Sequence, residues 1–316
     1  MRVTRQRALQ SVAAAATAPW WLRSADAQTM PVIRAALIPI EPAASIYYAA
    51  ENGFFTKAGI DVQITQNPSS PALAAAVASG TYDIAYAPIS TLAAAHSRGL
   101  PFVAITPGIG FVPGEIAGAI MVPMASTVKT AKDFNGKTFA CAGLGTIAEY
   151  QPRAWIDKYG GDSTTVKFIE MPFPEQIAAL NAGRVDAAFL VEPFITVATR
   201  SNTVRLLTTG DDAIGTSFLS TAWYATSQWA AAHPDLVTKF VGAMVAAARW
   251  GNANQDKVVP FLVKYLKADP ALAAAAHRPH FEERLVPAQM QPWIDVTARY
   301  AKFASFPATD IIYVPK

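Results

Sequence analysis

The chain is poor in the residues on which metal and redox chemistry depend. It has one cysteine, Cys141, among 316 residues, so an intramolecular disulfide is excluded. Cys141 does not follow the N-terminal segment, as a lipid-attachment cysteine would. It ends an apolar stretch, and we expect it to be a small buried hydrophobic residue. Histidine is also scarce, and no two of the four have metal-ligand spacing with cysteine or acidic partners: His96, His233, His277 and His280. His277 and His280 lie in a proline-broken segment and are expected at the surface, so we predict no metal and no cofactor.

The chain also lacks a large excess of charge. It has 26 basic and 23 acidic residues, of which the first 27 positions contain four and one, leaving 22 against 22. No basic stripe with interleaved aromatic residues appears, and this excludes nucleic acid as a partner.

The first 27 residues are typical of a signal peptide. Arg2, Arg5 and Arg7 form a basic start, residues 8–22 are uncharged and mostly apolar, and Ala25-Asp-Ala27 fits a cleavage site. The apolar part is shorter than the about 20 residues that span a bilayer. We therefore expect export to the periplasm, with the choice between general secretion and twin-arginine export left open. A frayed helix or a membrane anchor is the alternative.

Strand and helix patterns alternate through the first two thirds of the chain. Short apolar runs predict strands at 32–38, 62–65, 84–87 and 102–106, and again at 138–141, 166–170 and 187–191. Helical segments separate them, at 46–52, 71–79, 90–97, 147–158 and 174–182. The repeated order predicts an α/β fold with two doubly wound, mainly parallel sheets.

From residue 216 the pattern changes. A strand is predicted at 217–226, followed by alanine-rich packing helices at 235–252, 257–267, 271–277 and 289–304. Segments near 119–123 and 214–220 would connect two lobes as a hinge. We predict a first lobe over 28–120 and 216–316, including the C-terminal helices, and a second lobe over 121–215.

Polar residues begin the predicted helices at the edge of each sheet where ligands bind in α/β folds. These are Ser45, Ser90 with Thr91, and Gly145 with Thr146. A helix N-terminus offers up to four unpaired N–H groups and about half a positive charge, enough to hold a carboxylate, a sulfonate, nitrate or a polar ring. Taken singly, such residues are ordinary caps: Ser45 is expected to cap helix 46–52, and Thr146 with Glu149 has capping-box spacing.

Among charged residues, Glu192 is the strongest candidate for contact with a ligand. It follows a predicted strand and could accept a hydrogen bond from a ligand or cap a neighbouring backbone. Asp83 and Asp186 are placed as turn and strand-entry residues. The arginines of these regions are expected to be solvated: Arg98, Arg153 and Arg184.

Several motifs together resemble one family, the periplasmic solute-binding proteins of ABC importers for nitrate, sulfonates, taurine and thiamine-precursor pyrimidines. The first is Tyr48-Ala-Ala-Glu-Asn-Gly-Phe-Phe-Thr-Lys-Ala-Gly-Ile-Asp-Val, and the second is Gly80-Thr-Tyr-Asp-Ile-Ala. The others are Lys132-Asp-Phe-Asn-Gly-Lys-Thr, and Ala182-Gly-Arg-Val-Asp-Ala-Ala with the later Glu192-Pro-Phe. Val191 stands where the family often has tryptophan, which removes a ring-stacking surface.

The resemblance implies a type II periplasmic binding fold, whose two lobes close over a small anionic or polar solute and dock on a permease. We expect a monomer without enzymatic activity. The ligand-binding residues we predict are Glu41, Ala44, Ser45, Ile89, Ser90, Thr91, Leu144, Gly145, Thr146 and Glu192.

Two alternatives stay open. One is an enzyme on the same scaffold, similar to pyrimidine synthases or a desulfinase, but the cysteine-rich motif of the synthases is absent and Cys141 has no neighbouring base in the sequence. Residues 143–145 also do not form a phosphate or dinucleotide loop, since the Lys-Ser/Thr ending and the third glycine are missing. The other alternative is a sensory module that presents its ligand to a kinase.

Overall fold

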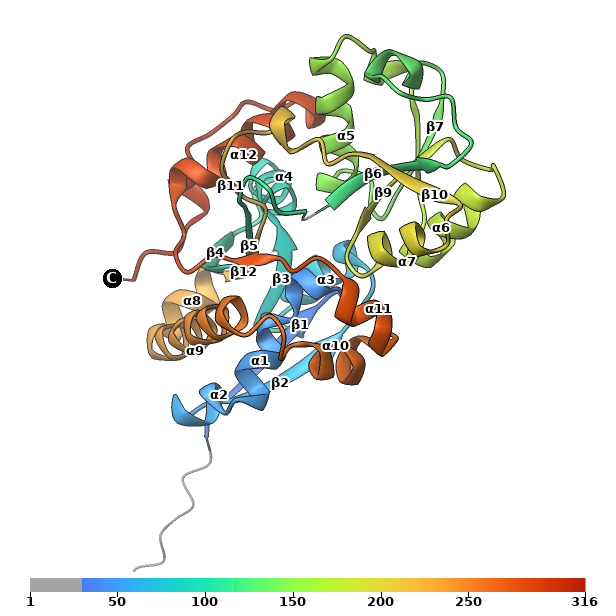
Figure 1. Ribbon diagram of the computed structural model, residues 1–316. Helices are drawn as coiled ribbons and strands as arrows, with labels where there is room; N and C mark the ends of the chain where they lie inside the picture. Colours follow the sequence, from blue (N-terminus) through green and yellow to red (C-terminus); the bar gives the residue numbers. More distant parts are fainter. Residues whose placement is uncertain (1–29, 117, 316) are drawn as a thin grey trace, which may run out of the picture. The chain divides into compact units, whose positions relative to one another are not determined.

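The computed structural model describes residues 30–116 and 118–315, so the predicted signal peptide lies outside the described residues. The described part contains two five-stranded sheets and a small three-stranded one, with helices between the strands (Figure 1). The predicted α/β class with two sheets is confirmed. Within these residues, none of the helices has the length and apolar character needed to cross a membrane.

The first sheet has the strand order β2-β1-β3-β12-β4. Its strands are β1 (Val32–Leu37), β2 (Asp61–Gln66), β3 (Ile84–Pro88), β4 (Phe102–Pro107) and β12 (Thr221–Thr226). β1 pairs in parallel with β2 and β3, whereas β12 is antiparallel to both of its neighbours. The connecting helices are a 3-10 turn (Glu41–Ala43), α1 (Ser45–Glu51), α2 (Phe54–Lys57), α3 (Ser70–Ala78) and α4 (Ile89–Ser97).

The second sheet repeats this arrangement with the order β8-β7-β9-β6-β10. Its strands are β6 (Gly118–Pro123), β7 (Thr138–Cys141), β8 (Lys167–Glu170), β9 (Ala187–Val191) and β10 (Val204–Thr208). Again the fourth strand in the order, here β6, is antiparallel to both neighbours. The helices are α5 (Ile147–Lys158), α6 (Phe173–Asn181) and α7 (Phe194–Arg200), with 3-10 turns at Ala131–Phe134, Ser163–Thr165 and Asp211–Ala213.

Two aspartates occupy equivalent positions in the two sheets. Asp83 precedes β3, and its carboxylate accepts a 2.8 Å hydrogen bond from the backbone N–H of Arg34 on β1. Asp186 precedes β9, and its carboxylate accepts a 2.9 Å bond from the N–H of Thr138 on β7. Each therefore ties the third strand in the order of its sheet to the second, which confirms the strand-entry role expected from the sequence.

Segment 119–123, predicted as a connection between lobes, is instead part of β6, which is paired on both sides. The predicted strand 217–226 is two strands, β11 (Phe218–Leu219) and β12, separated at Ser220. β11 and β13 (His280–Phe281) both pair with β5 (Ile109–Phe111) in the small sheet. The antiparallel pairing partners of these segments are far away in the sequence, so local pattern does not reveal them.

The C-terminal third is helical, as predicted. It contains α8 (Ser227–Ala232), α9 (Pro234–Ala253), α10 (Val259–Leu266), α11 (Pro270–Ala275) and α12 (Pro287–Ala301), and a final 3-10 turn at Ala308–Ile311. α9 packs on α1, and α12 packs on α4. Buried aromatic residues such as Trp223 and Trp293 fill the first sheet's core on its two faces, so these helices cover that sheet and leave its carboxyl edge to loops.

Candidate ligand-binding site

The first sheet ends in two segments that lie side by side. β1 and β3 are parallel neighbours, so the loop after β1 and the start of α4 after β3 leave the same edge. The hydroxyl of Tyr86, on β3, donates to the carbonyl oxygen of Pro42 at 2.9 Å and ties that loop to β3. Glu41, Ala44 and Ser45 on one segment and Ser90 on the other are thereby brought to one edge.

The helix starts differ from the sequence prediction. Helix α1 begins at Ser45 itself and has Ala44 as its N-cap, with no side-chain cap bond, so the predicted capping role of Ser45 is wrong. The reason is the 3-10 turn at Glu41–Ala43, which runs directly into α1 and moves the start by one residue. Ser45 is buried all the same, with 3% of its surface exposed.

Ser90 and Thr91 also lie inside their helix rather than at its cap. Pro88 is the N-cap of α4, so both residues belong to its first turn, after Ile89, whose N–H donates to the carbonyl of Ser220 at 2.9 Å. Ser90 is fully buried, and the hydroxyl oxygens of Ser90 and Thr91 have no hydrogen-bond partner among the described residues. A buried hydroxyl without a partner is costly, and it marks a position where a ligand group or water can bind.

Glu41 is a fully buried carboxylate in the loop after β1. Its Oε1 accepts a 2.6 Å bond from Nη1 of Arg278, whose side chain is 11% exposed, while Oε2 is buried without a partner in the described structure. Burial raises the pKa of Glu41 to about 7, against the opposing attraction of Arg278, and the charge of Glu192 raises it further. The carboxyl group thus has one oxygen fixed and one available.

Glu192 directly follows β9 of the second sheet and is 2% exposed. Its carboxylate caps α7, accepting bonds from the backbone N–H of Thr196 at 3.1 Å and from its hydroxyl at 2.9 Å. It also accepts a 3.0 Å bond from the backbone N–H of His277, next to Arg278. Of the two roles expected for Glu192, the structure shows the backbone cap; contact with a ligand stays a prediction.

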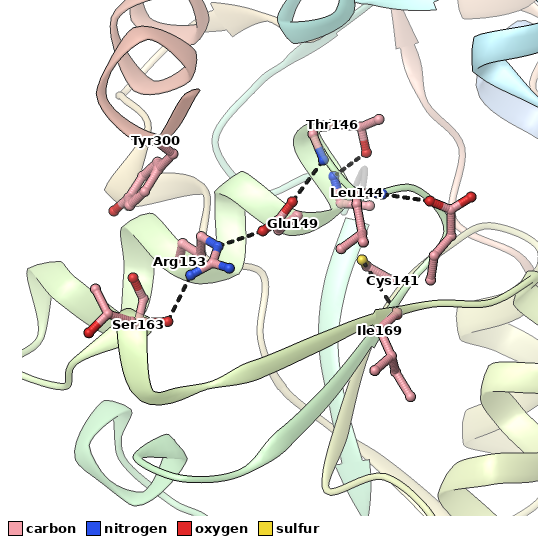
Figure 2. A network of polar contacts seen from close by, with 12 residues as sticks. Cys141, Leu144, Thr146, Glu149, Arg153, Ser163, Ile169 and Tyr300 are labelled. Atoms are coloured by element: carbon pink, nitrogen blue, oxygen red, sulfur yellow. Dashed lines mark hydrogen bonds and ion pairs between the residues drawn. The ribbon is translucent and has the colours of Figure 1, made fainter. Parts of the chain in front are cut away.

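The N-terminus of α5 is held by carboxylates (Figure 2). The N–H of Leu144 donates to Oε2 of Glu170 at 3.1 Å, and the N–H of Gly145 donates to Oε2 of Glu149 at 2.7 Å. Thr146 caps the helix as predicted, with its hydroxyl oxygen accepting from the N–H of Ala148 at 3.2 Å. Glu149, however, bonds to Gly145 and not to the cap residue as in a capping box. Of the loop N–H groups that we predicted as ligand donors, those of Leu144 and Gly145 are therefore satisfied within the chain, while that of Thr146 has no acceptor among the described residues.

Arg153 stabilises this arrangement, and its predicted solvated role is wrong. Its side chain is 20% exposed, and Nε donates to Oε1 of Glu149 at 2.7 Å. Nη1 donates to the carbonyl oxygen of Ser163 at 2.8 Å (Figure 2). The guanidinium lies 4.2 Å from the ring centre of Phe168. The other two arginines in the prediction, Arg98 and Arg184, are exposed.

Cys141 is fully buried at the end of β7, as predicted. Its thiol lies 3.7 Å from the carbonyl oxygen of Ile169, and burial raises its pKa to about 12. A thiol of this kind is not a nucleophile at neutral pH. Within residues 30–116 and 118–315, no three histidine, cysteine or acidic side chains are placed to hold a metal ion.

Three contributors to this region were missed at the level of sequence. Arg278 comes from the loop before β13, 237 residues from its partner Glu41, and no local pattern reveals such a pairing. For Glu170, the sequence predicts only that it ends the strand at 166–170. Tyr300 on α12 stacks on Tyr150 of α5, with ring centres 5.9 Å apart, and donates to Asp157 at 2.8 Å.

A family model described as NMT1/THI5 like matches residues 42–258. A putative binding protein of Brucella abortus is 25% identical over 224 residues, which cover 71% of this chain and 67% of that protein. The taurine-binding periplasmic protein of Escherichia coli K12 is 24% identical over 209 residues, covering 66% of this chain and 62% of the relative. These relatives carry the names of binding proteins, not of enzymes.

Among solved structures, the periplasmic aliphatic sulphonate binding protein SsuA of Escherichia coli has a TM-score of 0.75. The match covers 90% of this chain and 97% of SsuA at 18% identity, and it therefore concerns the fold. It agrees with the two-sheet topology described above. With more than half of its length matched by the family model, the chain belongs to the NMT1/THI5-like family.

Proposed function

We propose that this chain is the periplasmic solute-binding component of an ABC importer, and that it binds a small polar organic solute. Family membership and the names of the relatives support this role. The observation that carries the location of the site is the set of buried polar atoms without partners on Glu41, Ser90 and Thr91, all at the carboxyl edge of the first sheet. Such atoms are satisfied when a ligand supplies the missing hydrogen bonds.

The division into lobes follows from the same proposal. We place the first lobe at 28–120 and 216–316 and the second at 121–215, as the sequence predicts, except that β6 (Gly118–Pro123) lies wholly in the second sheet and so belongs to the second lobe. The solute would lie between polar groups of both lobes. The predicted contact residues are Glu41, Ala44, Ser45, Ile89, Ser90 and Thr91 from the first lobe, and Leu144, Gly145, Thr146 and Glu192 from the second. Closure requires that the solute bind the closed arrangement more tightly than the open one, because a ligand shifts a conformational equilibrium only by its differential affinity.

The protein works as a monomer that delivers its solute to a permease. The buried Cys141, with a pKa raised to about 12, supplies no nucleophile for the enzymatic alternative.

A thermal-shift screen of the mature protein, followed by calorimetry on the hits, tests the proposed function. The panel contains sulfonates, nitrate, carboxylates, pyrimidines, aromatic acids and amines. We expect at least one compound to raise the melting temperature and to bind with one-to-one stoichiometry, and small-angle scattering to show compaction on binding. Absence of any stabilising compound across these classes would contradict the function, and one that is chemically converted would point to an enzyme.

A further inference from the structure

The carboxylates around the proposed site constrain the charge of the solute. Four glutamates lie at the carboxyl edges of the two sheets: Glu41, Glu149, Glu170 and Glu192. Arg153 and Arg278 face them, but each arginine is already bonded to one of the glutamates and to a backbone carbonyl. The four carboxylates thus outnumber these two arginines, both of which are engaged; His277 lies beside Glu192, with Nδ1 3.5 Å from Oε1, and Arg98, near Tyr150 of α5, is exposed.

The loop before α5 carries carboxylates of the chain where an anion would approach. The N–H groups of Leu144 and Gly145 each have a carboxylate oxygen as acceptor, and the carboxylate of Glu149 is itself fixed by Arg153. An incoming sulfonate or nitrate would have to displace one of these carboxylates and would meet its charge at short range. Two of the N–H groups that sequence alone would assign to an anion, those of Leu144 and Gly145, are thus bonded to carboxylates of the chain, while the N–H groups of Thr146 and Ile147 have no acceptor among the described residues.

The carboxyl edge of the first sheet offers an unpartnered carboxylate oxygen instead. Oε2 of Glu41 is a buried acceptor without a partner in the described structure, and Oε1 is anchored to Arg278, which fixes the orientation of the carboxylate. Ser90 adds a second buried and unpartnered oxygen, four residues after Tyr86, which is bonded to the Glu41 loop through Pro42. The carboxylate oxygen of Glu41 is the acceptor that calls for a donating group, and the Ser90 hydroxyl, which can donate or accept, adapts to the same ligand.

We propose that the solute carries a protonated or N–H-bearing nitrogen, received by Oε2 of Glu41 and the hydroxyl of Ser90, and that it is not a simple anion. This inference rests on the proposed function, since it specifies the ligand of the same site. A charge-assisted bond from such a nitrogen to a carboxylate is about twice as strong as a neutral one, so this contact would dominate selectivity. Glu149 and Glu170 would contribute by rejecting solutes whose only polar group is anionic.

The test compares solutes that share a skeleton. In the thermal-shift and calorimetric assays, 2-aminoethanesulfonate is paired with ethanesulfonate, and benzylamine with phenylmethanesulfonate, beside the wider panel above. We expect every binding compound to carry a donor nitrogen, and its Kd to rise at least tenfold in Glu41→Gln. Ser90→Ala is the second variant, with an expected rise of about fivefold, in case Glu41→Gln fails to fold. Glu283→Gln, which alters an arginine-paired carboxylate on the surface, should leave the Kd unchanged.

The outcomes separate the two claims. Binding of compounds that lack a donor nitrogen, or an unchanged Kd in folded Glu41→Gln and Ser90→Ala, overturns this inference and leaves the proposed function standing. Failure of the whole panel to stabilise the protein overturns the proposed function and the inference with it.

Discussion

Replacing Arg278 by methionine should destabilise the protein in a pH-dependent way. The guanidinium is 11% exposed and bonds to a fully buried carboxylate at 2.6 Å, so its removal leaves Glu41 without the partner that permits ionisation. At pH 5 the carboxyl of Glu41, with a pKa of about 7, is protonated in the wild type, and the variant loses a hydrogen bond to a charged group, about 1.5–3 kcal/mol. Methionine keeps most of the apolar packing.

At pH 8 the cost is larger. The wild type is then about one pH unit above the pKa of Glu41 and gains about 1.4 kcal/mol from ionising the folded state. Without Arg278 the pKa rises further and this gain disappears, because burial of an unpaired carboxylate opposes ionisation. The loss in free energy of unfolding should therefore be about 1.4 kcal/mol greater at pH 8 than at pH 5.

Urea unfolding followed by tryptophan fluorescence at the two pH values measures this difference. In a Glu41→Gln background, Arg278→Met should cost the same at both pH values, since nothing remains to titrate. Arg249→Met is the matched control: its ion pair with Glu283 is 2.7 Å long but exposed, so the expected cost is about 0–1 kcal/mol. An equal cost of Arg278→Met at pH 5 and pH 8 would refute the reasoning about Glu41.

Two further predictions concern buried groups elsewhere. Cys141 should not react with a thiol reagent in the native state at pH 8 and should react fully in 6 M guanidinium, because burial raises its pKa to about 12; reaction of the native protein at the unfolded rate would contradict this. Asp211 is 3% exposed and hydrogen-bonded to Gln151, and burial raises its pKa from 3.8 to about 6. Its folded form holds a proton more tightly than its unfolded form, so it contributes up to about 3 kcal/mol of stability below pH 4 that is lost as the pH rises through 6. Unfolding experiments from pH 4 to 7 should show that Asp211→Asn removes this loss, and an unchanged pH profile would count against it.

The elements of the fold could be predicted where sequence signals are local. Apolar runs bounded by glycines gave the parallel strands of both sheets, and Asp83 and Asp186 were recognised at the strand entries they stabilise. The sequence predicts a connection between lobes where the structure has the antiparallel strand β6, because only the pairing with β9 and β10 shows that this segment belongs to a sheet. A pairing between strands that lie far apart in the sequence cannot be recognised from a short stretch of residues.

The sequence predicts where the site lies but not which charged groups line it. Ser90 and Thr91 were found because hydroxyl residues stand out at the beginning of a helix, although the structure places them after the cap. Glu149 and Glu170 accept bonds from the N–H groups of Gly145 and Leu144 before α5, which changes what this loop can bind, and for Glu170 the contact depends on the pairing of β7 with β8. Arg278 approaches Glu41 from the far end of the chain. These contacts are tertiary, so sequence patterns do not contain them.

A crystal structure of the protein with a solute identified by the binding screen tests the central claim most directly. We expect density for one small molecule that bonds to Glu41 or Ser90 from the first sheet and contacts at least one predicted ligand-binding residue of the second sheet. A solute bound elsewhere, with Glu41 and Ser90 bonded only to water, would contradict it.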